Sequence, residues 1–382
     1  MSFAVACSEA ESAVEAAAAV ADDLAAAFGD DSPSLVVLFA TAAHLGAMDA
    51  LAAVIAERLA PGVLLGAGAV SVVASGRELE EVPALVAWGA GEAHGAPVRF
   101  GPARGPDHSP IEELPLLDER PRTLLLLADP FSFPVDRLLR EIDARRLGVQ
   151  TVGGLASAAA SAGGNRLVLG GEVLDDGAVG LLLEPAAEVA TVVSQGCRPI
   201  GRPYVVTRGE RNLIHDLGGQ PVLERLQTIV EGLSEADRGL VQRGLHVGIV
   251  VNEHKLEFDR GDFLVRGVLG IERESRGLAV GDIVETGTSV QFHVRDAATA
   301  GEDLHRLMAG RQAEGALLFT CNGRGRRLFG TADHDASVVS GAISPAPLGG
   351  MFCAGEIGPV GRRSYLHGFT ASVALFGGGA DR

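Results

Sequence analysis

The sequence predicts an α/β protein with α+β character, in which layered mixed β-sheets carry helices on their outer faces. Continuous apolar runs recur along the chain, a helical pattern follows each run, and a glycine-rich stretch and a further apolar run close each unit. Apolar runs without alternation are typical of strands that are buried on both faces. The chain of 382 residues also exceeds the roughly 250–300 residues at which a single core stops growing, which favours more than one domain.

The first repeating unit follows an alanine-rich segment, residues 9–28, that predicts a helix ending at Gly29. The expected order is then a buried strand, a helix, a glycine turn and a second strand, at residues 35–41, 44–59, 62–76 and 84–90.

The same order recurs twice. The second copy is expected at residues 123–130, 134–146, 148–164 and 177–184, and the third at residues 316–325, 333–344, 349–361 and 369–376. Residues 62–71 and 148–157 share four of ten positions. We therefore expect a duplicated strand–helix–glycine-turn–hairpin unit, in copies too few and too unequal for a solenoid.

Between the second and third copies, residues 191–310 predict antiparallel strands with polar hairpins, together with helices. The expected strands include residues 245–253, 263–272, 281–287 and 289–296. A boundary near residues 185–190 gives an N-terminal helix at 1–34, a first domain at 35–188 and a second at 189–382. The glycine- and proline-rich residues 91–121 are expected to form a surface loop.

Composition excludes several classes of function. The net charge of −17 and the absence of a basic stripe argue against nucleic-acid binding and against docking on anionic lipid. The N-terminus is not typical of a signal peptide, and no apolar run is long enough to span a membrane. The four cysteines show no metal-like spacing, which suits a reducing cytoplasm. Scattered histidines and the lack of nucleotide-binding motifs predict no metal and no cofactor.

The candidate site begins at a glycine-flanked loop, Cys321, Asn322, Gly323, Arg324 and Gly325, directly after an apolar strand. Such a loop at the carboxyl end of a strand can present backbone N–H groups to an anion such as a carboxylate. The Arg324 side chain could add a bidentate contact. The structural alternative is a tight turn with no ligand.

Further polar residues follow in the third unit. Gly355 and Glu356 place a carboxylate in a rigid turn, where it could bind the amino group of a ligand. The structural alternative is a surface ion pair between Glu356 and Arg362 or Arg363. His367 and Thr370 open the last strand and could hydrogen-bond the same ligand. A histidine beside glycine also has a purely structural explanation.

Several of these segments resemble the FIST family. The specific motifs are QGCRPIG (195–201), residues 205–226, residues 268–297, CNGRG (321–325), GEIGP (355–359) and LHGFTAS (366–372). The resemblance extends over residues 35–184 and 204–352. It implies a non-catalytic bacterial sensory module that binds a small molecule, of which an amino acid is the suggested class. Its partner would be a sensor kinase or another signalling protein.

The resulting prediction for the ligand-binding residues comprises Cys321, Asn322, Gly323, Arg324, Gly325, Gly355, Glu356, His367 and Thr370. Two alternatives stay open. One is an enzyme in which Cys321 is the nucleophile, with His367 as base and Glu356 orienting it. The other is a scaffold that binds a signalling protein through the same glycine-rich face.

Overall fold

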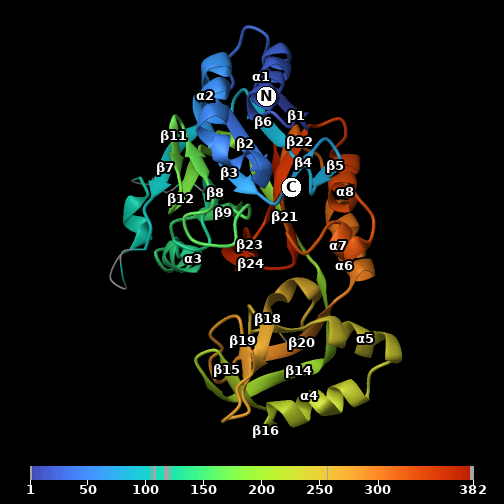
Figure 1. Ribbon diagram of the computed structural model, residues 1–382. Coiled ribbons are helices and arrows are strands. Elements are labelled where there is room, and N and C mark those ends of the chain that lie inside the picture. Colours follow the sequence, from blue (N-terminus) through green and yellow to red (C-terminus); the bar gives the residue numbers. More distant parts are fainter. Residues whose placement is uncertain are drawn as a thin grey trace. The chain divides into compact units, whose positions relative to one another are not determined.

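The computed structural model describes residues 2–103, 105, 109–115, 120, 122–255 and 257–378 (Figure 1). The chain forms two compact units. The first unit comprises Met1–Val193, Leu304–Leu366 and Thr370–Arg382, and the second comprises Ser194–Asp303 and His367–Phe369. The first unit is therefore discontinuous, and this division does not follow the linear boundary expected near residue 189. The chain leaves the first unit after its second repeat and returns to build the third.

Three repeats form the first unit, as the sequence predicts. Each repeat contains two parallel strands, and the three pairs are β2 (Leu35–Thr41) with β3 (Val63–Ala69), β8 (Arg122–Ala128) with β9 (Val149–Leu155), and β21 (Gly315–Cys321) with β22 (Leu348–Cys353). The connecting helices are α2 (Met48–Leu59), α3 (Val135–Ala144) and α8 (His334–Ile343). A return strand then pairs antiparallel with the first strand of each repeat: β6 (Leu85–Ala90), β12 (Ala178–Leu183) and β25 (Thr370–Phe376).

The hairpin of each repeat joins the sheet of a different repeat. The hairpin β4 (Ser71–Ala74) and β5 (Arg77–Glu80) pairs with β22, and β10 (Leu167–Leu169) and β11 (Glu172–Leu174) pair with β3. The hairpin β23 (Glu356–Val360) and β24 (Arg363–His367) pairs with β9. This cyclic exchange links the three sheets.

The glycine-rich segments that the sequence suggests as turns lie mainly in β3, β9 and β22. A side chain at Gly66, Gly153 or Gly350 would collide with the backbone of the adjacent parallel strand. These glycines therefore permit close approach of two backbones within a sheet, rather than a reversal of the chain.

The core of the first unit is shared by the repeats. Phe39 of β2 and Phe319 of β21 pack edge to face with ring centroids 6.2 Å apart, within a cluster that also contains Leu125 of β8. Alternate residues of the same strands face outward into separate clusters beneath the helices. This two-sided burial explains why the strands read as continuous apolar runs.

The N-terminal segment contains a strand that the sequence pattern does not predict. β1 (Phe3–Ser8) pairs antiparallel with β6, and α1 (Ala13–Phe28) follows it. The Ser12 side chain accepts a hydrogen bond from the Glu15 N–H and caps α1. The expected helix is thus confirmed with a later start.

The remaining elements of the first unit lie between the repeats, except η1 (Ala42–Ala47) and α7 (Arg326–Phe329), which lie within the first and third repeats. Part of the expected loop at 91–121 forms β7 (Gly95–Phe100), which pairs with β12, and the short helix η2 (Pro110–Glu113); part of it lies outside the described residues. The short helix η3 (Pro185–Ala187) and the strand β13 (Val189–Gln195) complete the list.

The second unit is a strand barrel. Its strands follow the order β14 (Cys197–Glu210), β20 (Ser289–Arg295), β17 (Leu245–Val250), β18 (Phe263–Ile271), β19 (Leu278–Val280), β15 (Leu213–Leu217) and β16 (Gln220–Pro221). A further pairing between β14 and β15 closes the ring. The helices α4 (Val222–Glu231) and α5 (Glu235–Arg243) follow β16, η4 (Arg260–Asp262) precedes β18, and α6 (Ala297–Met308) follows β20. The strand expected at residues 281–287 is not present; these residues form two bends, an irregular stretch and a turn. Among the helices of the described chain, none is long and apolar enough to cross a membrane.

Candidate functional site

The predicted loop starts at the carboxyl end of a parallel strand pair. Cys321 is the last residue of β21 and lies in register with Cys353, the last residue of β22. The preceding in-register residues, Phe319 and Met351, belong to the shared core. Because side chains alternate along a strand, both cysteines face that core and not the outer helices. This end of parallel strands is where open α/β sheets commonly place ligands.

The loop after Cys321 uses its own backbone donors. Asn322 N donates to the carbonyl of Cys353 at 2.9 Å, and Arg324 N donates to the carbonyl of Cys321 at 2.8 Å. Gly323 N donates to the sulfur of Cys321 at 3.4 Å. Three of the N–H groups suggested as a carboxylate cradle thus hold the turn together. A ligand that used them would have to displace these bonds.

Gly325 is required by its surroundings. Its φ of +59° lies in the left-handed region, and an added Cβ would stand 2.8 Å from a carboxylate oxygen of Glu80. Glycine is the residue that meets both conditions without strain. The loop therefore combines a tight turn with close packing against β5.

Arg324 is fully buried and forms a bidentate ion pair with Asp335 near the start of α8. Nε and Nη2 of Arg324 donate to the two carboxylate oxygens at 2.6 and 2.8 Å. Thr320 donates its hydroxyl to the same carboxylate at 2.7 Å. Burial raises the pKa of Asp335, but the Arg324 charge and these hydrogen bonds outweigh it and hold the pKa below its usual range. Asp335 is therefore ionised. Its carboxylate occupies Nε and Nη2 of Arg324, so these two nitrogens are not available to a ligand.

Glu78 of β5 extends this network. Its carboxylate accepts from the N–H groups of Asp335 and Ala336, at 2.9 and 3.1 Å, at the amino end of α8. Burial, followed by the negative charge of Asp335, raises the pKa of Glu78 to about 7. Glu78 and Asp335 were not identified from the sequence, because the exchanged hairpin joins residues more than 250 positions apart.

Glu356 is the most perturbed carboxyl group of the predicted site. It begins β23, is fully buried, and accepts from the N–H and the hydroxyl of Thr370 through Oε2, at 3.0 and 2.8 Å. Burial raises its pKa to about 8, against the opposing effects of Thr370, of the Arg324 charge and of a hydrogen bond with Cys321. Glu356 is thus protonated at neutral pH, and since Oε2 accepts two hydrogen bonds, the proton belongs on Oε1.

The surface ion pair that the sequence offers as an alternative role for Glu356 does not form. Arg363 pairs instead with Asp143 at 3.1 Å. The neighbouring Gly355 is buried and its carbonyl accepts from the Leu155 N–H at 2.8 Å, which ties the start of the hairpin to β9.

Three buried polar atoms of this cluster have no hydrogen-bond partner among the residues that the structure describes. They are Asn322 Oδ1, Arg324 Nη1 and Glu356 Oε1. Arg324 and Glu356 influence each other's pKa, and both are coupled to Cys321. We call Cys321, Asn322, Arg324, Glu356 and Thr370 the Glu356 cluster.

His367 is the exception among the predicted site residues. It ends β24, is buried, and belongs to the second unit with Gly368 and Phe369. The other eight predicted residues belong to the first unit.

Comparison with known proteins identifies the family to which this chain belongs. Residues 34–220 match the FIST N domain and residues 222–359 match the FIST C domain. The chain therefore belongs to the FIST family, whose domains act in signal transduction.

Individual relatives are similar over nearly their whole length. The uncharacterized protein Mb0898c of Mycobacterium bovis is 44% identical over 375 residues, which cover 96% of this chain and 95% of that protein. The uncharacterized protein Rv0628c of Mycobacterium tuberculosis is 44% identical over 372 residues, 95% of each chain.

Proposed function

We propose that this protein is a non-catalytic sensor that binds an amino acid, or a closely related small metabolite, at the Glu356 cluster. Its cellular setting would be the cytoplasm, and its output partner a sensor kinase or another signalling protein. The observation that supports the proposal is the set of three buried polar atoms without partners.

These atoms match the two charged groups of an amino acid. Nη1 of Arg324 is a donor suited to a carboxylate. Oδ1 of Asn322 is an acceptor suited to an ammonium group, and Oε1 of Glu356 becomes one when this carboxyl group loses its proton. An unsatisfied buried polar group costs about 1–3 kcal/mol, so a ligand that satisfies all three regains a substantial free energy.

Ligand entry requires a local opening. Asn322 and Gly323 are half-buried and Ala354 is exposed, whereas Arg324 and Glu356 are not accessible. The turn that follows Cys321 is therefore the segment that we expect to move when the ligand enters.

Binding of an ammonium group should also change the protonation of Glu356. A neutral carboxyl group must lose its proton to form an ion pair, so the bound state favours the carboxylate. Because the pKa of the empty site is about 8, affinity should rise about tenfold per pH unit as the pH approaches 8, and then level off.

The test is calorimetric titration with amino acids that raise the melting temperature in a thermal-shift screen. A hundredfold excess over Kd adds about 2.7 kcal/mol of stability. Glu356→Gln should weaken binding at least tenfold and abolish its pH dependence, because the amide presents an N–H group at the Oε1 position. Asn322→Ala should weaken binding as well.

The matched control is Arg326→Ala, which removes an exposed guanidinium two positions after Arg324. Its affinity should equal that of the native protein. Amino-acid binding that is insensitive to both Glu356→Gln and Asn322→Ala would show that the ligand binds elsewhere.

The catalytic alternative needs a reactive, accessible thiolate at Cys321, whereas the structure buries that cysteine.

A further inference from the structure

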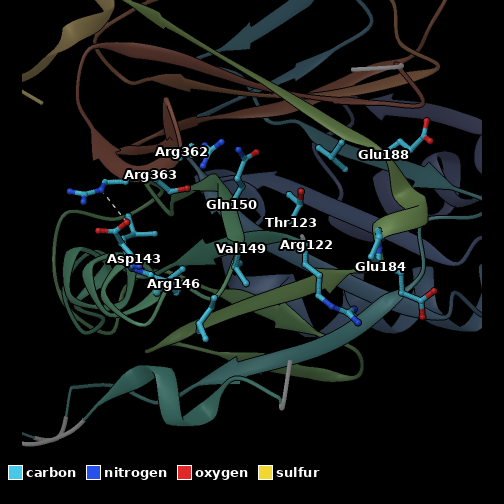
Figure 2. A pocket seen from close by; sticks show the side chains of 17 residues that line it. Arg122, Thr123, Asp143, Arg146, Val149, Gln150, Glu184, Glu188, Arg362 and Arg363 are labelled. Atoms are coloured by element: carbon cyan, nitrogen blue, oxygen red, sulfur yellow. Dashed lines mark ion pairs between the residues drawn. The ribbon is translucent and has the colours of Figure 1, made fainter. Parts of the chain in front are cut away.

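A pocket of about 760 Å³ lies in the first unit, apart from the Glu356 cluster. It is formed by the amino ends of β8 and β9, the carboxyl end of α3, the turn after β12 and the turn between β23 and β24 (Figure 2). The Glu356 cluster lies at the other end of the β23–β24 hairpin. Small-molecule sites typically occupy roughly 300–1,000 Å³, so this pocket has the size of a binding site.

One side of this pocket, which we call the strand-end pocket, is basic. Arg146, Arg362 and Arg363 gather there with Asp143 (Figure 2). Asp143 pairs with Arg363 at 3.1 Å, which leaves Arg146 and Arg362 as guanidinium groups without a partner among the described residues. Such a concentration of arginine is notable in a chain with a net charge of −17.

The opposite side is acidic. Glu184 and Glu188 lie there, with Arg122 extending toward them from the start of β8 (Figure 2). The side chains of Glu184 and Glu188 make no ion pair with any part of the chain that the structure describes. The two sides carry net charges of opposite sign, so the pocket has a strong electrostatic polarity along its length.

Two of these charged residues have a left-handed backbone conformation. Arg146 has a φ of +53° and Glu188 a φ of +42°. Residues other than glycine, asparagine and aspartate adopt this region at a cost, and such conformations are enriched at functional sites. One lies on the basic side and the other on the acidic side.

Two polar side chains lie between the two sides of the pocket. Thr123 of β8 and Gln150 of β9 lie side by side in register, and both line the pocket (Figure 2). Neither side chain has a hydrogen-bond partner in the described parts of the chain. A hydroxyl and an amide in this position can orient a ligand that extends from one side to the other.

We propose that the strand-end pocket is a second ligand site, which binds an elongated zwitterion. Its carboxylate lies against Arg146 and Arg362, and its ammonium group lies toward Glu184 and Glu188. An α-amino acid carries its ammonium and carboxylate groups on the same carbon atom, so it is less suited to a pocket whose opposite charges lie on opposite sides. Two sources supply the required chemistry, a short peptide or an ω-amino acid.

Calorimetric titration of the full chain tests the proposal, with trialanine and 6-aminohexanoate as probes. At least one should bind, and acetylation and amidation of the trialanine termini should weaken binding at least tenfold. If trialanine binds and 6-aminohexanoate does not, the ligand class is peptide; the reverse result assigns an ω-amino acid.

Charge-neutralising variants locate the site. Arg362→Gln and Glu188→Gln should each weaken binding of the probe at least tenfold. Arg145→Gln is the matched control, because Arg145 is an exposed neighbour of Arg146 that does not line the pocket. If neither probe binds, or if binding survives both variants, the proposal is wrong.

The result of this test is independent of the result for amino-acid binding at the Glu356 cluster. Arg362 lies outside that cluster, so Arg362→Gln should leave the affinity for an α-amino acid unchanged. Loss of the elongated probe alone therefore identifies the strand-end pocket.

Discussion

The protonated state of Glu356 leads to a quantitative prediction about stability. Burial raises the pKa of this carboxyl group from 4.5 to about 8 in the folded protein. Between these values the folded state holds a proton that the unfolded chain has released, so unfolding releases a proton and rising pH favours it. The stabilising contribution is complete below about pH 4.5 and is lost as the pH rises through the folded pKa.

The size of the effect follows from the shift. One pKa unit corresponds to about 1.36 kcal/mol, so Glu356 alone should lower the free energy of unfolding by roughly 4 kcal/mol between pH 5 and pH 8. The amide in Glu356→Gln mimics the neutral carboxyl group, so the free energy of unfolding of this variant should not fall in this way as the pH rises. The variant should therefore match the native protein near pH 5 and be several kcal/mol more stable at pH 8.

Urea unfolding at the two pH values measures the difference. Trp88 is the only tryptophan of the sequence and is fully buried in the shared core, so its fluorescence reports on the first unit. Glu78, whose pKa is also raised, affects native and variant proteins equally. Glu57→Gln, at an exposed position on α2, is the control. An equal pH dependence in native protein and Glu356→Gln would refute the assignment of a neutral, buried Glu356.

Two further predictions concern the architecture around this site. Arg324→Ala should cost about 3–5 kcal/mol in urea unfolding, because it leaves the charge of Asp335 buried without its partner; the exposed Arg326→Ala should cost less than about 1 kcal/mol, and equal losses would contradict the assignment. Gly350→Ala should destabilise by about 1–3 kcal/mol or more, since the added methyl group collides with a carbonyl of β21. Gly341→Ala, in open space on α8, should instead stabilise by up to about 1 kcal/mol; tolerance of alanine at Gly350 would argue against the close strand packing.

The sequence predicts the repeated unit well because local patterns encode it. The strands β2, β8 and β21 each contain an apolar run without alternation, and this matches strands that the structure covers on both faces. The exchange of hairpins could not be predicted in this way. A glycine such as Gly350 has the same local signature in a turn and in a tightly packed strand, and only the neighbouring backbone distinguishes the two.

The candidate site shows the same limit. Cys321, Arg324 and Glu356 were identified from glycine-rich motifs, and the structure brings them into one buried cluster. The partners that determine their charge state come from elsewhere: Asp335 from the start of α8 and Thr370 from the start of β25. No local pattern predicts that Arg324 would pair with a protein carboxylate.

The most direct test of the account is calorimetric titration of an amino acid identified by thermal shift, at pH 6 and pH 8, into native protein and Glu356→Gln. We predict binding to the native protein that strengthens at least tenfold between the two pH values, and weak, pH-independent binding to the variant. Equal affinities of both proteins at both pH values would contradict a ligand site at Glu356.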